Sequence, residues 1–203
     1  MFAPKKFKTI RIKLTMRKLL ICVFLTCSTY FTNAQTGIFK TYQDYLSGNI
    51  EKMSDDVNVK GTSLGLSYHF ISTDGSNVKY KPKNFWGFLY KGYLFRSNGS
   101  YTAMLQDSGK VCYYINGEAG VKSIRNGKDY GVTIVGPYCF LSSGDFSTDL
   151  YGMPRNGFDQ KGLRKFKNDF SEFEDLFECI DNFSNCENLS KCVQEFNSKK
   201  KKK

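Results

Sequence analysis

Alternating apolar and polar positions fill the centre of the chain. Leu64, Leu66, Tyr68 and Phe70 alternate with small or polar residues, and four short runs of aromatic and β-branched residues follow over 85–116. Glycine-containing turns separate these runs, at Lys91-Gly92, Asn98-Gly99, Ser108-Gly109 and Asn116-Gly117. A period of two, interrupted by turns at this spacing, predicts an antiparallel meander. Further strands are expected at 130–135 and 138–141.

The first predicted hairpin turns at Lys91-Gly92. A two-residue loop there fixes three cross-strand pairs: Tyr90 with Tyr93, Phe88 with Phe95, and Trp86 with Ser97. Because alternate residues share a face, one face of this hairpin is expected to be almost entirely aromatic. The other face holds Phe85, Leu89 and Leu94, with Arg96 opposite Gly87.

A second hairpin is expected to turn at Ser108-Gly109. The same alternation places six apolar residues together on one face and Cys112 on the other. The six residues are Tyr101, Ala103, Leu105, Val111, Tyr113 and Ile115.

Before the strands, a short helix is expected after Thr41. Asp44 follows this threonine at the spacing of a capping box, and Gly48 is a signal for the helix end. The polar segment 49–60 is interpreted as a linker to the sheet.

Behind the strands, the apolar residues recur at steps of three and four, which indicates helix. One stripe runs through Leu163, Phe166, Phe170, Phe173, Phe177 and Ile180. Ser171 and Ser184 each begin a capping box. The predicted helices span 172–181 and 185–196. The expected fold class is α+β: an antiparallel meander sheet or partial barrel covered by a carboxy-terminal helical hairpin.

The formal charge of +11 belongs to the two ends of the chain. Residues 1–34 hold seven Lys or Arg and no acid, and 199–203 are five lysines, so that 35–198 are close to neutral. A near-neutral body gives no reason to expect nucleic acid as a partner. The poly-lysine tail lacks interleaved aromatic residues and is interpreted as a solvated, disordered end, the alternative being contact with an anionic surface.

The amino-terminal segment has the three parts of a bacterial signal peptide. Arg17 and Lys18 are basic, 19–25 are apolar, and Thr32 and Ala34 occupy the −3 and −1 positions of a cleavage site. The apolar run is too short to span a bilayer, so no transmembrane segment is expected after cleavage.

Cleavage at this site makes 1–34 a signal peptide and 35–198 a single exported domain. Met16 begins a signal of ordinary length and is therefore an alternative start to an extended basic region. The expected location is the periplasm, the outer surface or the medium.

Five cysteines remain after the signal, and export permits disulfides. Their odd number leaves at least one thiol free or intermolecular. Cys112 and Cys139 lie on predicted strands and could be bridged, whereas Cys179 could reach Cys186 or Cys192. Buried, inert thiols are the alternative for all five.

No sequence motif indicates catalysis. Residues 61–65 match the G-x-S-x-G pattern of hydrolases, but the single histidine, His69, stands in the same predicted strand, so a catalytic triad has no base in the required order. The sequence contains no H-E-x-x-H, C-x-x-C, Walker or G-x-G-x-x-G pattern, and no metal or cofactor is expected. Asp55-Asp56, Asp145 and Asp149 could serve a carboxylate-based hydrolase, but solvated surface acids are the favoured interpretation.

Candidate ligand-binding residues gather on the first hairpin. Trp86, Tyr90, Tyr93 and Arg96 could form a platform on which sugar rings stack, and the alternative is an ordinary aromatic core.

Short motifs resemble those of a group of uncharacterised, exported, β-rich proteins of Gram-negative bacteria. The residues are Trp86-Gly87-Phe88, Gly92 and Phe95-Arg96, which follow Phe39-Lys40-Thr41-Tyr42. This resemblance implies export and a W-G-[FY] strand with an aromatic-Arg pair, and no activity.

The sequence favours a non-catalytic protein over an enzyme. The leading hypothesis is a structural or protein-interaction module, because fold determinants are abundant and reactive constellations are scarce. The first alternative is a glycan- or small-ligand-binding β-domain, and the second is the carboxylate-based hydrolase. Protein or glycan is the partner class that these hypotheses imply.

Overall fold

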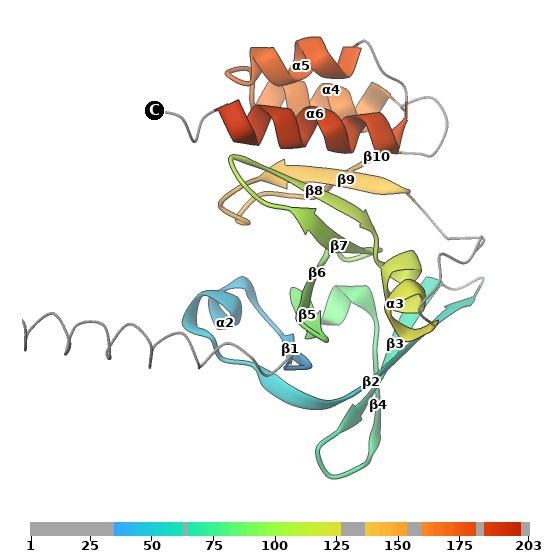
Figure 1. The fold of residues 1–203 in the computed structure, drawn as a ribbon. Coiled ribbons are helices and arrows are strands. Elements are labelled where there is room, and N and C mark those ends of the chain that lie inside the picture. The colour runs from blue at the N-terminus through green and yellow to red at the C-terminus, as the bar shows by residue number, and fades with distance from the viewer. Residues whose placement is uncertain (1–34, 63–64, 127–136, 154–159, 182–184, 200–203) are drawn as a thin grey trace, which may run out of the picture. The chain divides into compact units, whose positions relative to one another are not determined.

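A computed structural model describes residues 35–62, 65–126, 137–153, 160–181 and 185–199 (Figure 1). The strands are β1 (Gly37–Phe39), β2 (Glu51–Thr62), β3 (Gly65–Ser72), β4 (Asn77–Tyr80), β5 (Gly87–Tyr90), β6 (Tyr93–Ser97), β7 (Thr102–Asp107), β8 (Val111–Asn116), β9 (Cys139–Ser143) and β10 (Tyr151–Met153). The helices are α2 (Tyr42–Ser47), the 3-10 helix η2 (Pro82–Asn84), α3 (Gly117–Asn126), α4 (Gln160–Asp169), α5 (Glu174–Asp181) and α6 (Cys186–Lys199).

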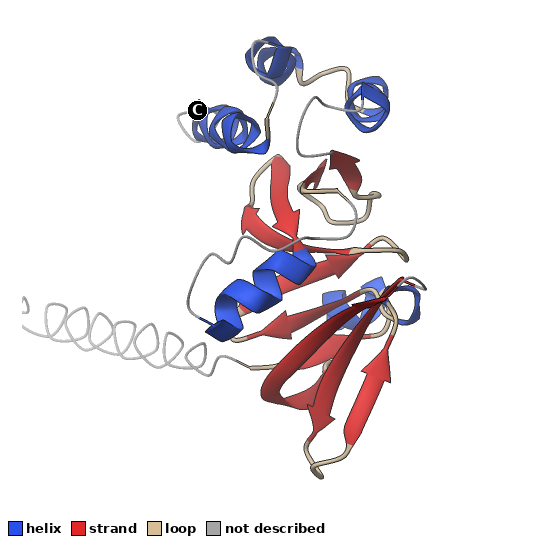
Figure 2. Ribbon diagram, turned by 90° about the vertical axis from the view of Figure 1, so that its right-hand side faces the viewer, coloured by secondary structure: helices blue, strands red, loops and turns tan. Residues whose placement is uncertain are grey.

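All of these strands belong to one curled antiparallel sheet (Figure 2). Its order is β10-β9-β8-β7-β6-β5-β1-β2-β3-β4. Consecutive strands therefore pair everywhere except at β4 and β5, because β4 forms one edge of the sheet and β5 pairs with β1 instead. The prediction of an α+β fold built on a meander sheet is confirmed. The strand expected at 130–135 lies outside the described residues.

Most of the hydrophobic core lies on one side of the sheet, called here the core face. Phe88, Phe95 and Met104 of the central strands form one cluster there with Val121 of α3. A second cluster joins β8, β9 and β10 to the three carboxy-terminal helices. Ile115 contacts both clusters, which places α3 and α4–α6 on the same side of the sheet.

The opposite side, called here the reverse face, has a smaller cover. Ala103, Cys112, Tyr114 and Phe140 form its buried cluster. Leu150 and Phe146 of the β9–β10 loop pack against this cluster, so the loop crosses the reverse face. The two sides of the sheet therefore differ: helices cover the core face, whereas a loop and α2 partly cover the other.

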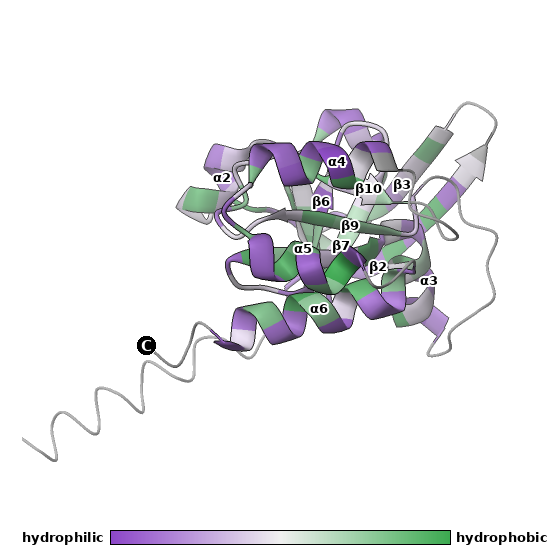
Figure 3. Ribbon diagram, turned by 90° about the horizontal axis from the view of Figure 1, so that it is seen from above, coloured by the Kyte–Doolittle hydropathy of each residue, from purple (hydrophilic) through white to green (hydrophobic). Residues whose placement is uncertain are grey.

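Three helices, and not two, follow the sheet. The predicted apolar stripe is buried in the core, but it is divided by a turn at 170–173 between α4 and α5. α4 packs on β10, and α6 packs on β8, where the amide of Asn197 binds both backbone groups of Val111. The helices have distinct hydrophobic and hydrophilic sides (Figure 3). The expected two-helix hairpin is not confirmed, and its turn at 182–184 lies outside the described residues.

The prediction that 49–60 form a linker is wrong, because this segment belongs to the twelve-residue strand β2. Val57 and Val59 are buried and the residues between and after them are not, which is the pattern of a half-buried strand. A register shift between Met53 and Val57 interrupts the alternation. This irregularity concealed the strand in the sequence.

The predicted face of the second hairpin is also wrong. A register shift between Leu105 and Asp107 makes Leu105 pair with Tyr114 and Ala103 pair with Asn116. A β-bulge moves every later residue to the opposite face, since the side-chain period is two. Ala103 and Leu105 therefore share the reverse face with Cys112, instead of facing away from it.

The short helix α2 forms as the sequence predicts. Thr41 accepts a hydrogen bond from the Asp44 backbone, and the Asp44 carboxylate accepts one from the Thr41 backbone, which completes the capping box. Gly48 ends the helix at φ 70°, a conformation that favours glycine. Among the described residues, no helix has the length and apolar character needed to cross a membrane.

Candidate functional site

The reverse face carries an apolar groove of about 530 Å³. Its floor consists of Leu89 of β5, Leu94 of β6 and Leu105 of β7, each of which is half-buried. The aromatic side chains of Tyr45 and Phe146 line it as well, and so do Ser108, Gly109 and Gly144.

Strand register sets the floor of the groove. The hairpin pairs Leu89 with Leu94 and Gly87 with Arg96, as the sequence predicts. The next pair along β6 and β7 is Phe95 with Met104, which places Leu94 opposite Leu105. Three leucines thus lie side by side across three strands, on the side that the helices α3–α6 do not cover.

α2 supplies the aromatic residue Tyr45. The ring of Tyr45 lies 4.6 Å from that of Trp86 and 5.7 Å from that of Phe146, measured between centroids. The neighbouring Tyr42 donates a hydrogen bond of 2.7 Å from its hydroxyl to the Asp145 carbonyl. α2 and the β9–β10 loop are therefore held together beside the groove. Burial raises the pKa of the Tyr45 phenol.

The β9–β10 loop is organised around Asp145. Its carboxylate accepts hydrogen bonds from the hydroxyls of Ser143 and Ser147, and these bonds lower its pKa. Phe146 follows with φ 61°, a left-handed conformation that is uncommon for a bulky residue. With its backbone in this conformation, Phe146 places its side chain in the lining of the groove.

A buried arginine lies next to these aromatic residues. Arg96 is 3% exposed; its Nη1 donates to the Tyr114 hydroxyl at 3.0 Å and to Ser142 Oγ at 3.1 Å. Its Nη2 donates to the Thr148 carbonyl at 2.8 Å. Its Nε is buried and has no hydrogen-bond partner. No carboxylate forms a salt bridge with Arg96 within the described parts of the chain.

Three aromatic rings surround the guanidinium. Its central carbon lies 5.3 Å from the ring centroid of Trp86, 5.7 Å from that of Phe146 and 5.8 Å from that of Tyr114. Cation–π contacts of this kind offset part of the cost of burying the charge. Burial raises the pKa of Tyr114 to about 12, although the positive charge of Arg96 acts in the opposite direction.

The structure separates the residues of the predicted aromatic platform. Tyr90 is 1% exposed and lies in the core with Phe88, whereas Tyr93 is 49% exposed. Trp86 lies against Arg96 on the reverse face, and not beside Phe88 as the alternation predicts. The alternation fails there because β5 begins at Gly87, and the Trp86 backbone instead donates to the carbonyls of Phe39 and Lys40.

Four of the five cysteines of the domain form disulfides. Cys139 bonds to Cys186, and Cys179 bonds to Cys192. The structure therefore pairs Cys139 with a helix residue instead of with Cys112. Cys112 is a free, buried thiol on the reverse face, and burial raises its pKa.

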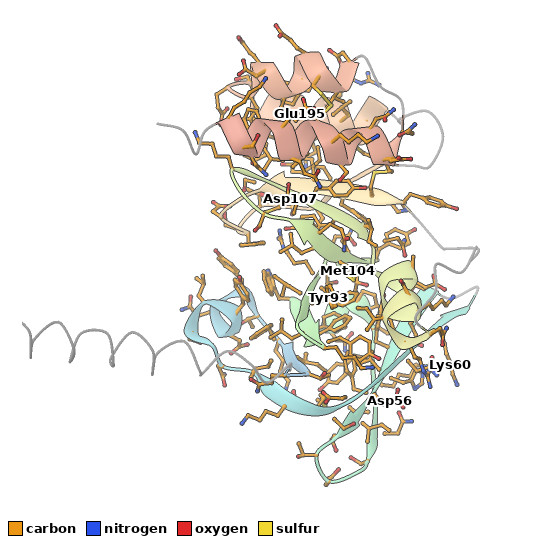
Figure 4. All side chains as sticks on the ribbon, in the orientation of Figure 1. Asp56, Lys60, Tyr93, Met104, Asp107 and Glu195 are labelled. Carbon is orange, nitrogen blue, oxygen red and sulfur yellow. A yellow bond between two sulfur atoms is a disulfide. The ribbon has the colours of Figure 1, made fainter. Side chains whose placement is uncertain are left out.

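The candidate acids do not converge. Asp55 and Asp56 are exposed on β2, and Asp56 Oδ1 lies 3.8 Å from Nη2 of Arg125 in α3. Asp56 is well away from Asp107, which ends β7 (Figure 4). Asp145 binds its own loop, and Asp149 pairs with Lys165 of α4. A general acid needs a raised pKa, whereas that of Asp145 is lowered.

The serine motif at 61–65 spans a hairpin between β2 and β3. Gly61 pairs with Leu66 and Thr62 pairs with Gly65, so the segment joins two strands. A nucleophile elbow requires a strand followed by a helix. Ser63 itself lies outside the described residues. Across the described parts of the chain, no three His, Cys, Asp or Glu side chains gather as metal ligands.

Sequence reasoning placed Leu89, Leu94 and Arg96 on a common face but missed the rest of the site. Tyr45 and Phe146 are far apart in the chain and meet only in the folded protein. A lone aromatic residue in the polar segment 142–149 was the one available signal for Phe146.

The fold and the groove define an α+β protein with a small apolar cavity on the less covered side of its sheet. No protein family, curated protein or solved structure matches this chain.

Proposed function

We propose that the protein is an exported, non-catalytic binding module whose ligand places an apolar group in the reverse-face groove. One observation carries the proposal: three leucines remain half-buried at the floor of a cavity of about 530 Å³. Small-ligand sites have volumes of about 300–1,000 Å³ and are lined mainly by apolar and aromatic side chains with a few polar groups. The groove fits this description in its volume and in its leucine and aromatic lining, and it is shallow and open to solvent.

A small apolar ligand accounts for the groove better than a glycan does. Sugar recognition by stacking needs exposed rings in a common plane. Trp86 and Tyr90 lie on opposite sides of the sheet, and Tyr90 is buried, so these rings supply no such plane.

Export and the carboxy-terminal cover are parts of the same proposal. Two disulfides are compatible with an oxidising compartment, which the predicted signal peptide also requires. We treat α5 and α6, which Cys179–Cys192 joins, as one helical hairpin that shields the core face and leaves the reverse face for the ligand. We also propose that the protein belongs to the group of exported proteins that it resembles at Trp86-Gly87-Phe88 and Phe95-Arg96.

Protein interaction is the second candidate function. Leu46 of α2 is 56% exposed and Tyr93 of β6 is 49% exposed, and tyrosine is enriched in protein interfaces. Replacing both residues with glutamate is expected to abolish self-association of the chain that begins at Gln35, measured by sedimentation. Unchanged association would reject this role for the two residues.

The groove is tested with an apolar fluorescent probe, N-phenyl-1-naphthylamine, titrated into the chain that begins at Gln35. Leu94→Gln places an amide in the floor and is expected to weaken binding about tenfold or more, since burying an unpaired polar group costs about 1–3 kcal/mol. Leu105→Phe fills the cavity without adding polarity and is expected to weaken binding as well.

Leu46→Gln is the matched control, because Leu46 is exposed on α2 and does not line the groove. It should bind the probe as the unmodified chain does. Thermal unfolding of each variant establishes that it is folded. Absence of probe binding, or equal binding by Leu94→Gln and the unmodified chain, would reject the proposed site.

A further inference from the structure

The guanidinium of Arg96 is buried with part of its hydrogen-bonding capacity unused. A guanidinium has five N–H donors. Three of them bind Tyr114, Ser142 and Thr148, which leaves the N–H of Nε and one of Nη2. A buried charge of this kind is costly unless an opposite charge accompanies it. The described residues provide no such anion.

This charge lies directly behind the groove. Phe146 lines the groove and also covers the guanidinium, with 5.7 Å between its ring centroid and the central carbon of Arg96. Tyr45 lines the groove as well, and its phenol is close enough for the charge of Arg96 to act on its pKa. One aromatic ring therefore separates an apolar cavity from an unpaired cation.

We propose that the ligand of the groove is a single-chain amphiphile with a terminal carboxylate, whose apolar chain lies on the three leucines and whose carboxylate binds Arg96. This inference rests on the proposed function of the groove. A carboxylate accepts two N–H groups of one guanidinium in a planar arrangement, and two are left on Arg96. The ligand thereby supplies both the apolar surface and the negative charge that the site lacks.

Phe146 controls access to the charge. Its ring has to turn away from the guanidinium before a carboxylate can reach Nε. The Asp145 hydrogen bonds to Ser143 and Ser147 keep the rest of the loop in place during this movement.

The test compares ligands that differ only in the head group. Decanoate, decanol and decyltrimethylammonium are titrated at pH 8, below the micelle concentrations of the two ionic ligands and below the solubility limit of decanol. The fluorescence of Trp86, the single tryptophan of the chain, reports binding. Decanoate is expected to bind about tenfold tighter than decanol or more, because hydrogen bonds to charged groups are the stronger ones. Decyltrimethylammonium is expected to bind more weakly than decanol, since it brings a second cation next to Arg96.

Phe146→Ala separates the head-group contact from the apolar contact. The variant uncovers Arg96 and removes part of the apolar lining. The preference for decanoate over decanol should therefore increase at least threefold, while decanol itself binds more weakly. Leu46→Ala is the control and should leave the preference unchanged, because Leu46 lies outside the groove. If Phe146→Ala does not fold, the comparison of the three ligands on the unmodified chain still tests whether the groove prefers a carboxylate.

The outcomes distinguish the inference from the function on which it rests. Equal affinities for decanoate and decanol would overturn the carboxylate inference and leave the apolar groove standing. Failure of all three ligands and of the naphthylamine probe to bind would overturn both. A preference for decanoate that Phe146→Ala abolishes would overturn the role of Phe146 as a cover.

Discussion

At the residue scale, the β5–β6 turn holds a lysine in an unfavourable conformation. Lys91 has φ 48° and Gly92 has φ 84°, and two positive φ values in a two-residue hairpin loop define a type I′ turn. Glycine adopts this conformation freely and asparagine tolerates it, whereas a lysine pays a steric cost. The exposed Lys91 side chain is 5.5 Å from the Tyr90 ring, a contact of small energy at an exposed site.

Lys91→Asn should therefore stabilise the protein. The expected gain in the free energy of unfolding is about 0.5–1 kcal/mol, because asparagine-glycine is the preferred pair in this turn. Urea unfolding of the chain from Gln35 measures it. Lys91→Ala is the control: it removes the same side chain but keeps the backbone strain, so it should bring no gain. Equal gains from both variants would contradict the argument.

Single residues also mark the limit of sequence reasoning at the site. Tyr90 and Tyr93 face each other as predicted, but one is buried and the other exposed, since burial depends on what covers each end of the hairpin. Trp86 leaves the alternation because the strand has not yet begun at that position. Alternation predicts faces only inside a regular strand.

At the element scale, regular pairing was predictable and bulges were not. The register of β5 with β6 follows from a two-residue turn, and it is confirmed from Tyr90–Tyr93 to Gly87–Arg96, whereas the expected pair Trp86–Ser97 lies before the start of β5. The prediction of which residues of β7 and β8 share a face was wrong, because one bulge, near Gln106, reverses the alternation. β2 was missed for the same reason. A bulge adds a residue without a sequence signal of its own, so its consequences appear only in the paired structure.

The two disulfides stabilise different connections. Cys139–Cys186 ties β9 to α6 across a separation of 47 residues, whereas Cys179–Cys192 ties α5 to α6 across 13. The longer connection restricts the unfolded chain more, because the entropy of closing a loop grows with the logarithm of its length.

Removing the longer disulfide should therefore cost more. Replacing both cysteines of Cys139–Cys186 with alanine is expected to lower the free energy of unfolding by about 1 kcal/mol more than the same change at Cys179–Cys192. Urea unfolding of the two double variants measures the difference. A larger loss at Cys179–Cys192 would show that local packing between α5 and α6 outweighs chain entropy. Both variants keep Cys112, so the free thiol is the same in each.

At the scale of the whole molecule, the parts that sequence could not predict are those that join distant segments. Fold class follows from periodicity, which is local. The groove depends on the approach of α2 to the β9–β10 loop, through the bond from Tyr42 to Asp145 across 103 positions. The pairing of Cys139 with Cys186 likewise depends on where α6 lies on the sheet. No local pattern encodes either contact.

Buried tyrosines on both faces of the sheet make the stability of the domain sensitive to high pH. Burial raises the pKa of Tyr113, on the core face, to about 12, and that of Tyr114, on the reverse face, to about 12. In the unfolded chain a tyrosine ionises near its ordinary pKa of about 10. Above that pH the unfolded state loses protons that the folded state keeps, so ionisation favours unfolding.

The free energy of unfolding should therefore be insensitive to these tyrosines below about pH 10 and should fall between about pH 10 and 12. Each tyrosine contributes a slope of at most about 1.4 kcal/mol per pH unit in that range. Tyr113→Phe should reduce the slope, because phenylalanine keeps the ring in the core and cannot ionise. Tyr93→Phe is the matched control, since it makes the same chemical change at a half-exposed position outside the core. Denaturant unfolding at intervals over this pH range measures all three chains, and an identical slope for Tyr113→Phe and the unmodified chain would exclude Tyr113 as a cause of alkaline unfolding.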